Sequence, residues 1–308
     1  MTAATVEHRW ALPWRGGAGR AQELPALSPQ RQLARAFVVF IGAIAAAIVL
    51  QLAVLSTFQE RSSQQSAYDA FRKELAEGTA PLGAADSNGK LLKLGTPIAY
   101  LEIPSIGVRQ VVVEGTTSSA LFKGPGHRRD TPFPGQPGTS LIAGRRAAYG
   151  GPFEHLASLA KGATIHVTTG QGAFDYKVLD VRHAGDPLPA PFKSGSGRLV
   201  LATAAGRPFM PSDVAWVDAD LAVPPVGAAS GRIATAALPA NEKLMALDSS
   251  TLWPLALWLQ ALFLVLVGAI WAWQRWDRAK AWMVCLPPLV LVSLATASEI
   301  AKFLPNLL

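Results

Sequence analysis

Three long apolar stretches constrain the fold of this 308-residue chain more than any other feature, at residues 36–58, 252–273 and 281–302. A helix of about 20 apolar residues crosses the hydrocarbon core of a bilayer and satisfies its own backbone polar groups. We therefore predict three transmembrane helices, with the lipid bilayer as a partner. The alternatives are a cleaved signal peptide for the first stretch, which is longer than a usual signal core, and a buried soluble hairpin for the other two.

The net charge of +7 is mainly an orientation signal, because many basic residues gather beside the apolar stretches. They are Arg9, Arg15, Arg20, Arg31 and Arg35 before the first stretch, and Arg275, Arg278 and Lys280 between the last two. Positively charged loops stay in the cytoplasm. We therefore predict a multi-pass protein of the cell membrane whose N-terminus is cytoplasmic and whose middle part is extracytoplasmic. Nucleic-acid binding is excluded because no folded domain collects these basic residues.

The remaining segments follow from changes in composition. They are a disordered basic tail at 1–35, an extracytoplasmic helix and linker at 59–96, a central domain at 97–223, a linker at 224–251, a cytoplasmic loop at 274–280 and an extracytoplasmic C-terminus at 303–308. The central domain alternates apolar and polar residues between turns rich in Gly and Pro, which indicates a closed or nearly closed β-barrel. The strands are expected at 98–103, 110–113, 139–144, 164–169, 174–181, 198–203 and 215–221, with one helix at 153–159.

Several motifs of the central domain occur in the order typical of one family. They are IAYLEIPSIGV at 98–108, VVVEGT at 111–116, GPGH at 124–127, PGQPG at 134–138, IAGRRAAYGGPF at 142–153 and LVLAT at 199–203. In these motifs the chain closely resembles the sortases, and among them the class E and F type of actinobacteria. Sortases are membrane-anchored cysteine transpeptidases that join surface proteins to the Gram-positive cell envelope. The resemblance implies a membrane-anchored all-β fold: an eight-stranded sortase-like β-barrel between one N-terminal and two C-terminal transmembrane helices.

The same resemblance implies where catalytic residues would lie, and the chain departs from the family at each place. The family's histidine corresponds to Arg145, its nucleophilic cysteine to Ala204 and its assisting arginine to Val214. A methyl group cannot attack a carbonyl, and a guanidinium does not shuttle protons at physiological pH. The resemblance therefore implies a pseudoenzyme with no catalytic residue.

A relocated nucleophile is the alternative. The hydroxyls of Thr203 and Ser212 lie near the expected cleft, but a hydroxyl needs an adjacent base. The imidazoles of the domain belong to His127, His155, His166 and His183. His127 is part of the GPGH turn, which favours a structural role. No Cys or His pair has the spacing of metal ligands, so we expect neither a metal nor a cofactor. The lone Cys285 is expected to pack within the last apolar stretch.

A barrel without its catalytic residues still offers a groove for a peptide. The candidate groove residues are His127, Arg145, Arg146, Thr203 and Arg207. Arg145 either fills the vacated pocket, or clamps an acidic or C-terminal group of a partner, or is simply exposed. We expect a binding or scaffolding subunit for a membrane-anchored or secreted surface protein, in an assembly of one or several further subunits. The alternative is an active, cysteine-independent transpeptidase or peptidase.

Overall fold

The computed structural model describes residues 28–86, 88–191, 193, 195–227, 232–247 and 252–308. The chain divides into two units, residues 1–41 and residues 42–308, and the second contains the barrel. The disordered tail predicted at 1–35 lies outside the described residues as far as residue 27.

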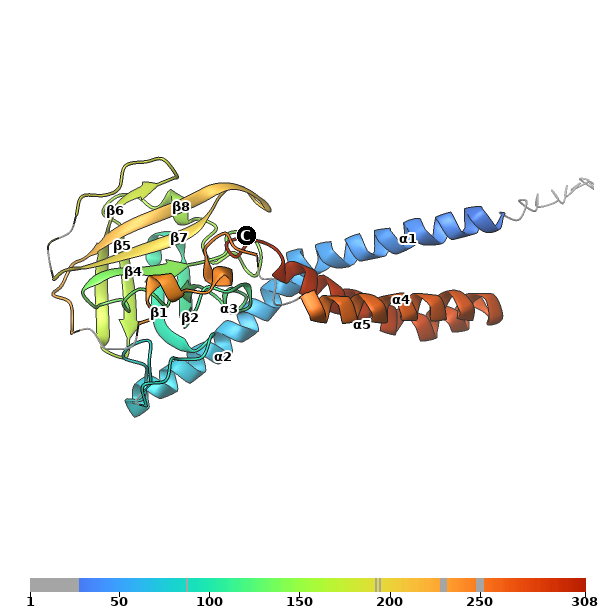
Figure 1. The fold of residues 1–308 in the computed structure, drawn as a ribbon, viewed down its shortest axis with the longest axis horizontal. Helices are drawn as coiled ribbons and strands as arrows, with labels where there is room; N and C mark the ends of the chain where they lie inside the picture. Colours follow the sequence, from blue (N-terminus) through green and yellow to red (C-terminus); the bar gives the residue numbers. More distant parts are fainter. Residues whose placement is uncertain (1–27, 87, 192, 194, 228–231, 248–251) are drawn as a thin grey trace, which may run out of the picture. The chain divides into compact units, whose positions relative to one another are not determined.

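The N-terminal helix is longer than the predicted span. It consists of α1 (Pro29–Leu50), one π-helical turn η1 (Gln51–Leu55) and α2 (Ser56–Glu77), in continuous succession (Figure 1). It ends at Gly78, whose positive φ of 68° is easily reached only without a Cβ. The outer part of α2 lies against the barrel, because Phe71 is buried and the side chain of Gln64 bonds to both backbone groups of Val111.

Among the described residues, eight strands close into a barrel in the order β1-β2-β3-β4-β7-β8-β6-β5 (Figure 1). Their bounds are β1 Pro97–Ile103, β2 Val108–Glu114, β3 Gly126–His127, β4 Gly138–Ala143, β5 Thr164–Thr169, β6 Gly172–Arg182, β7 Gly197–Arg207 and β8 Met210–Leu221. The eight-stranded barrel predicted from the sequence is thus confirmed. The sequence pattern missed β3, because two residues are too few to show alternation.

The barrel core is one continuous apolar cluster contributed mainly by alternate residues of the strands. Its fully buried members include Ile98, Leu101, Ile142, Phe153, Leu156, Ile165, Leu199, Leu201 and Val217. The helix expected at 153–159 is wrong: only the 3₁₀ turn η3 (Leu156–Ser158) forms. Phe153 and Leu156 are both fully buried, and a 3₁₀ turn brings residues three apart onto one side.

Two of the strand pairs are parallel, β2 with β3 and β4 with β7. The second pair places the end of β4 beside the middle of β7, with Ala143 opposite Ala202. β7 in turn pairs with β8 in antiparallel fashion. The short helix α3 (Ser118–Leu121) follows β2 and is capped by Thr117, whose hydroxyl accepts a hydrogen bond from the Ala120 N–H.

The C-terminal part contains the other two apolar helices, α4 (Leu252–Arg275) and α5 (Arg278–Lys302). Within the described residues, three helical segments are long and apolar enough to cross a membrane, as predicted: 41–77, 252–275 and 279–302. The loop predicted at 274–280 is shorter in the structure, because only Trp276 and Asp277 separate the helices. Charged residues at helix ends can reach the interface, so they do not require a longer loop.

Candidate functional site

The three positions at which the resemblance places catalytic residues lie at one end of the barrel. Arg145 follows β4 after Gly144, whose N–H donates to the carbonyl of Ala202 on β7 at 2.9 Å. Ala204 lies further along β7 and is paired with Val214 on β8. Gly144 has no room for a side chain, because a Cβ there would lie 2.3 Å from the Phe153 ring. The strand register therefore brings all three positions together.

Ala204 and Val214 belong to a second apolar cluster, separate from the barrel core. This site cluster consists of Leu121, Leu141, Ala143, Ala204 and Leu307, with Val214, Trp216 and Leu244 packed against it. Ala204 is 3% exposed, and Leu307 is fully buried. Leu307 comes from the chain after α5, which we call the C-terminal segment (Pro305–Leu308). The cluster that contains Ala204 is therefore completed by a side chain more than a hundred residues away in sequence.

Arg145 is completely buried, so of the alternatives left open by the sequence it is not the exposed residue. Its Nη2 donates to the hydroxyl of Ser118 at 2.7 Å, and its Nη1 donates to the main-chain oxygen of Leu308 at 3.2 Å. The guanidinium carbon lies 4.7 Å from the ring centre of Phe122 and 5.4 Å from that of Tyr149, which suits cation–π contact. Arg145 thus connects α3 to the C-terminal segment.

The electrostatics of Arg145 are unusual for a buried cation. No Asp or Glu of the described part of the chain forms a salt bridge with it, and its Nε has no hydrogen-bond partner there. Burial lowers the pKa of Arg145 to about 10, so the group stays charged at pH 7. A buried guanidinium with an unused donor favours an additional acceptor in this place.

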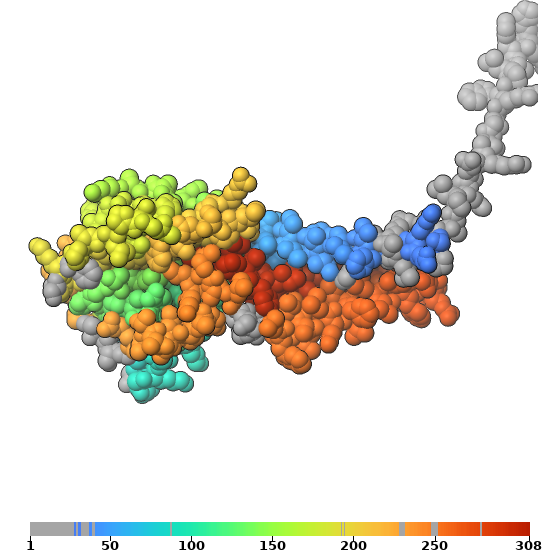
Figure 2. Space-filling view, turned by 45° about the horizontal axis from the view of Figure 1, so that its top comes forward, coloured from blue at the N-terminus to red at the C-terminus, as the bar shows by residue number. Residues whose placement is uncertain are grey.

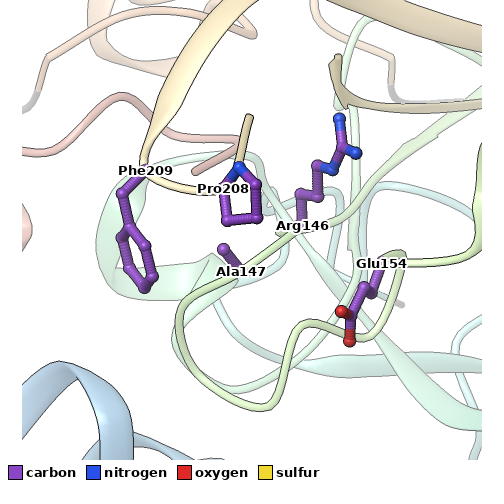
Figure 3. Close-up of a pocket in the computed structure, with 5 residues that line it drawn as sticks. All are labelled: Arg146, Ala147, Glu154, Pro208 and Phe209. Carbon is purple, nitrogen blue, oxygen red and sulfur yellow. The ribbon is translucent and has the colours of Figure 1, made fainter. Parts of the chain in front are cut away.

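Arg146 and Arg207 have different surroundings from Arg145. Arg146 is half-buried, and its Nη1 lies 3.3 Å from the carbonyl oxygen of Ala204. It lines a shallow pocket of about 190 Å³ together with Ala147, Glu154, Pro208 and Phe209. Figure 3 shows that the Arg146 guanidinium and the Glu154 carboxylate point in different directions. Arg207 is exposed near the end of β7.

His127 is fully buried and faces no open surface. Its Nδ1 lies 2.9 Å from a carboxylate oxygen of Glu114, and its Nε2 lies 3.0 Å from the carbonyl oxygen of Pro132. The ring packs edge-to-face on Phe133 at 5.0 Å between centres. The structure therefore gives His127 a place in the interior, where it joins β3 to β2 and to the following loop.

Thr203 is also buried, and its hydroxyl donates to the carbonyl of Gly144 at 2.9 Å. Its contact is thus within the barrel and not with a groove. Among the described residues, no group of three or more His, Cys, Asp or Glu side chains could hold a metal ion.

The sequence did not indicate a strap formed by residues 240–246 of the linker. The strap carries the short turn η5 (Ala240–Glu242) and is fastened to the barrel by Glu242, which forms two charge-assisted hydrogen bonds with Arg129, one of them 3.0 Å long. The hydroxyl of Thr116 donates to the Glu242 carbonyl. The strap is orange in Figure 2, where it covers part of the green barrel surface. A lone Glu-Lys pair in a linker rich in Ala and Pro was its only signal.

The strap also holds the C-terminal segment. The N–H of Asn306 donates to the carbonyl of Ala246 at 3.1 Å. Its side-chain amide donates to the carbonyls of Asn241 and Lys243, each at 2.8 Å. The carbonyl of Leu307 accepts from the N–H of Arg146 at 3.0 Å. The segment is therefore clasped between the strap and the residues that follow β4.

Comparison with known proteins agrees with this geometry. The family model described as "Sortase domain" matches residues 101–203. Sortase D of Bacillus subtilis (strain 168) is 27% identical over 129 residues, which are 41% of this chain and 64% of that protein. The chain thus spans just under two thirds of the length of this relative.

Among solved structures, a Sortase D5 transpeptidase of Clostridium perfringens is 24% identical, with a TM-score of 0.44, over 53% of this chain and 99% of that one. Sortase E of Streptomyces avermitilis is 28% identical, with a TM-score of 0.37, over 49% of this chain and 100% of that one. The family match over residues 101–203 includes the end of β1, all of β4 and part of β7, which contribute to the candidate site and its barrel. The barrel domain of this chain is therefore similar to the sortase domain, which its residues 101–203 match.

Proposed function

We propose that this chain is a noncatalytic sortase-like subunit whose barrel binds a short peptide segment of a membrane-anchored or secreted surface protein at a Gram-positive cell envelope. Transpeptidation by sortases needs a nucleophile that attacks a carbonyl and a group that transfers the proton. The one observation that carries the proposal is the environment of Ala204. It presents a methyl group inside an apolar cluster that also contains Leu307 of the C-terminal segment.

The surroundings of Arg145 support the same conclusion. Two of its nitrogens are engaged, with Ser118 and with Leu308, and it is charged at neutral pH. It therefore neither accepts nor releases a proton in the working range. What it does is hold a main-chain oxygen of a bound segment, which is a binding role.

The alternative, an active enzyme with a relocated nucleophile, finds less support. The hydroxyl of Thr203 donates to a backbone carbonyl, and that of Ser118 accepts from Arg145. Neither hydroxyl is hydrogen-bonded to an imidazole or a carboxylate of the described residues. His127, the nearest imidazole in sequence to Ser118, is enclosed with Glu114. A hydroxyl without a base is a weak nucleophile.

The arrangement of the helices supports a location in the cell membrane. Three crossings place the barrel, which follows the first, and the C-terminal segment, which follows the third, on one side. This agrees with the place of Leu307 and the barrel residue Ala204 in one cluster, and with the hydrogen bond from the Arg146 N–H to the Leu307 carbonyl. The basic residues near 1–35 and 274–280 favour the cytoplasm for the other side. The barrel is therefore extracytoplasmic in this proposal.

The test uses the full chain purified from its membrane in a mild detergent. We expect a second protein in stoichiometric amount by mass spectrometry, and no mass increase of the chain after incubation with a peptide library. The matched control is Thr203→Val, which keeps the shape and removes the hydroxyl adjacent in sequence to Ala204. A covalent acyl adduct on the wild-type chain that Thr203→Val lacks would overturn the proposal and establish the active alternative.

A further inference from the structure

We infer that the C-terminal segment is a built-in, displaceable occupant of the binding site, and that the partner inserts a tight turn of the same kind in its place. This inference rests on the proposed function and specifies what the site recognises. The recognised turn carries a side-chain amide followed by a large apolar residue, as Asn306 and Leu307 do.

The segment contacts the barrel as a bound peptide would. Its backbone bonds to the barrel through Arg145 and Arg146, at 3.2 and 3.0 Å, and these bonds are independent of side-chain identity in the segment. Two side chains supply the selectivity. Leu307 enters the site cluster beside Ala204, and the amide of Asn306 donates two hydrogen bonds to the strap.

The shape of the segment is a turn and not a strand. The N–H of Leu308 donates to the carbonyl of Pro305 at 3.0 Å, so Asn306 and Leu307 form the tip. The three residues from Asn306 onward are buried, whereas Pro305 is only half-buried. The site therefore receives the tip of the turn together with Leu308, and the preceding flank at Pro305 is the partly exposed one.

The hydrogen bonding at the C-terminal segment is incomplete, which makes the segment replaceable. Arg145 Nε and Asn306 Oδ1 are buried, and neither has a hydrogen-bond partner in the described part of the molecule. Buried polar atoms are usually hydrogen-bonded, so each of these two atoms has an unused capacity for a hydrogen bond. A partner that offers an acceptor to Arg145 Nε would bind better than the built-in turn.

The tether decides which partners can compete. Only Phe303 and Leu304 separate the segment from α5, so its effective concentration at the site is high. A freely diffusing peptide competes poorly with a tethered one. The partner is therefore a protein confined to the same membrane, whose turn lies close to its own membrane anchor.

The experiment measures how fast a thiol at the site reacts. In the full chain with Cys285→Ser, the change Ala204→Cys places a reporter thiol under Leu307, and Ala219→Cys places a reference thiol in the barrel core. The change Leu307→Asp puts a carboxylate in the site cluster and expels the segment. Leu304→Asp, at a half-buried position outside the cluster, is its matched control.

We expect Leu307→Asp to raise the rate at which a maleimide labels the thiol at position 204 at least tenfold, and Leu304→Asp to leave that rate within a factor of two. The thiol at position 219 stays protected in both. The peptide Phe-Leu-Pro-Asn-Leu-Leu then lowers the raised rate again, and a peptide of the same composition in scrambled order does not. A chain that ends at Leu304 gives the same pattern without a new charge.

Three results would overturn the inference. The thiol at position 204 could stay protected both in Leu307→Asp and in the chain that ends at Leu304, the thiol at position 219 could become reactive as well, or the peptide could fail to protect the thiol at position 204. The second would mean that the segment is a permanent part of the fold. These results differ from those expected if only the proposed function is wrong. If only the proposed function is wrong, the site opens and the peptide protects the thiol at position 204, but no partner co-purifies with any variant.

Discussion

The barrel core and the site cluster are both buried, but they differ in where their contacts originate. The core is built mainly by the strands of the barrel, and the buried imidazole of His127 lies against Glu114 of the neighbouring strand β2. The site cluster is completed by Leu244 and Leu307, which come from outside the strands. The core can therefore form from the barrel alone, whereas the site needs a segment that arrives after two more helices.

This difference separates the burial of the barrel core, which is part of folding, from the burial of the site cluster, which resembles the binding of a peptide. Opening the core exposes the whole barrel, so its cost is part of global unfolding. Opening the site requires only that a few residues leave, so its cost is that of a local transition. Matched changes in the two regions should therefore differ in their effect on stability.

The largest effect is expected for truncation of a core leucine. Leu101→Ala removes a fully buried side chain from the barrel core and should lower the free energy of unfolding by about 2–5 kcal/mol. Leu307→Ala removes an equally buried leucine, but the segment can leave at less than the global cost. We expect a loss below about 1.5 kcal/mol. Chemical denaturation in detergent, followed by tryptophan fluorescence, measures both, and equal losses would remove the distinction.

The second effect is a pH dependence that belongs to the core. Burial raises the pKa of Tyr176 to about 12, although its oxygen accepts a hydrogen bond from the Gly135 N–H at 2.6 Å. In the unfolded chain the group ionises near pH 10, so its contribution is complete below about pH 10 and is lost as the pH rises to about 12. The loss amounts to about 3 kcal/mol.

Tyr176→Phe tests this, because phenylalanine cannot ionise. The free energy of unfolding of the wild type should fall more steeply between about pH 10 and pH 12 than that of the variant. The missing hydrogen bond gives only a constant difference, whereas ionisation changes the slope. Parallel curves would show that Tyr176 ionises as easily in the folded barrel as in the unfolded chain.

Much of the barrel could be predicted because its signals are local. Apolar stretches predicted the helices, alternation predicted most strands, and the order of motifs placed Arg145 and Ala204 at one end of one barrel. The partners of Arg145 could not be predicted, because Ser118 and Leu308 are 27 and 163 residues away. The pattern around Arg145 is that of an ordinary loop.

The strap shows the same limit. Glu242 lies in a segment whose composition is that of a linker, and only its pairing with Arg129, 113 residues away, reveals its role. Local composition reports whether a segment can form regular structure. It does not report whether an irregular segment is fixed by a distant ion pair.

The third prediction concerns the pair that fastens the strap. Glu242 is buried and Arg129 largely so, and hydrogen bonding to Glu242 raises the pKa of Arg129. A double-mutant cycle with Arg129→Met and Glu242→Met should give a coupling of about 1–2 kcal/mol for retention of the C-terminal segment, measured by thiol protection at position 204. The exposed pair Arg109 and Glu102, at 3.7 Å, is the control and should give less than about 0.5 kcal/mol.

The smallest effect on stability is expected for the buried cation of the site. Arg145 bears the cost of desolvation without an Asp or Glu partner in the described part of the chain, so Arg145→Met should change the free energy of unfolding by less than about 1 kcal/mol. The control is Arg182→Met in the barrel, which leaves the buried carboxylate of Asp218 without its 2.6 Å partner. We expect that change to cost about 2 kcal/mol or more.

A second measurement separates stability from binding in the same variant. Because Arg145 holds the Leu308 oxygen, Arg145→Met should raise the labelling rate of the thiol at position 204 several-fold while the thiol at position 219 stays protected. Arg182→Met should leave the labelling rate at position 204 unchanged. If Arg145→Met instead destabilised the barrel as much as Arg182→Met does, Arg145 would be a structural ion of the fold. The contrast between a self-contained core and a site completed by a distant segment would then disappear.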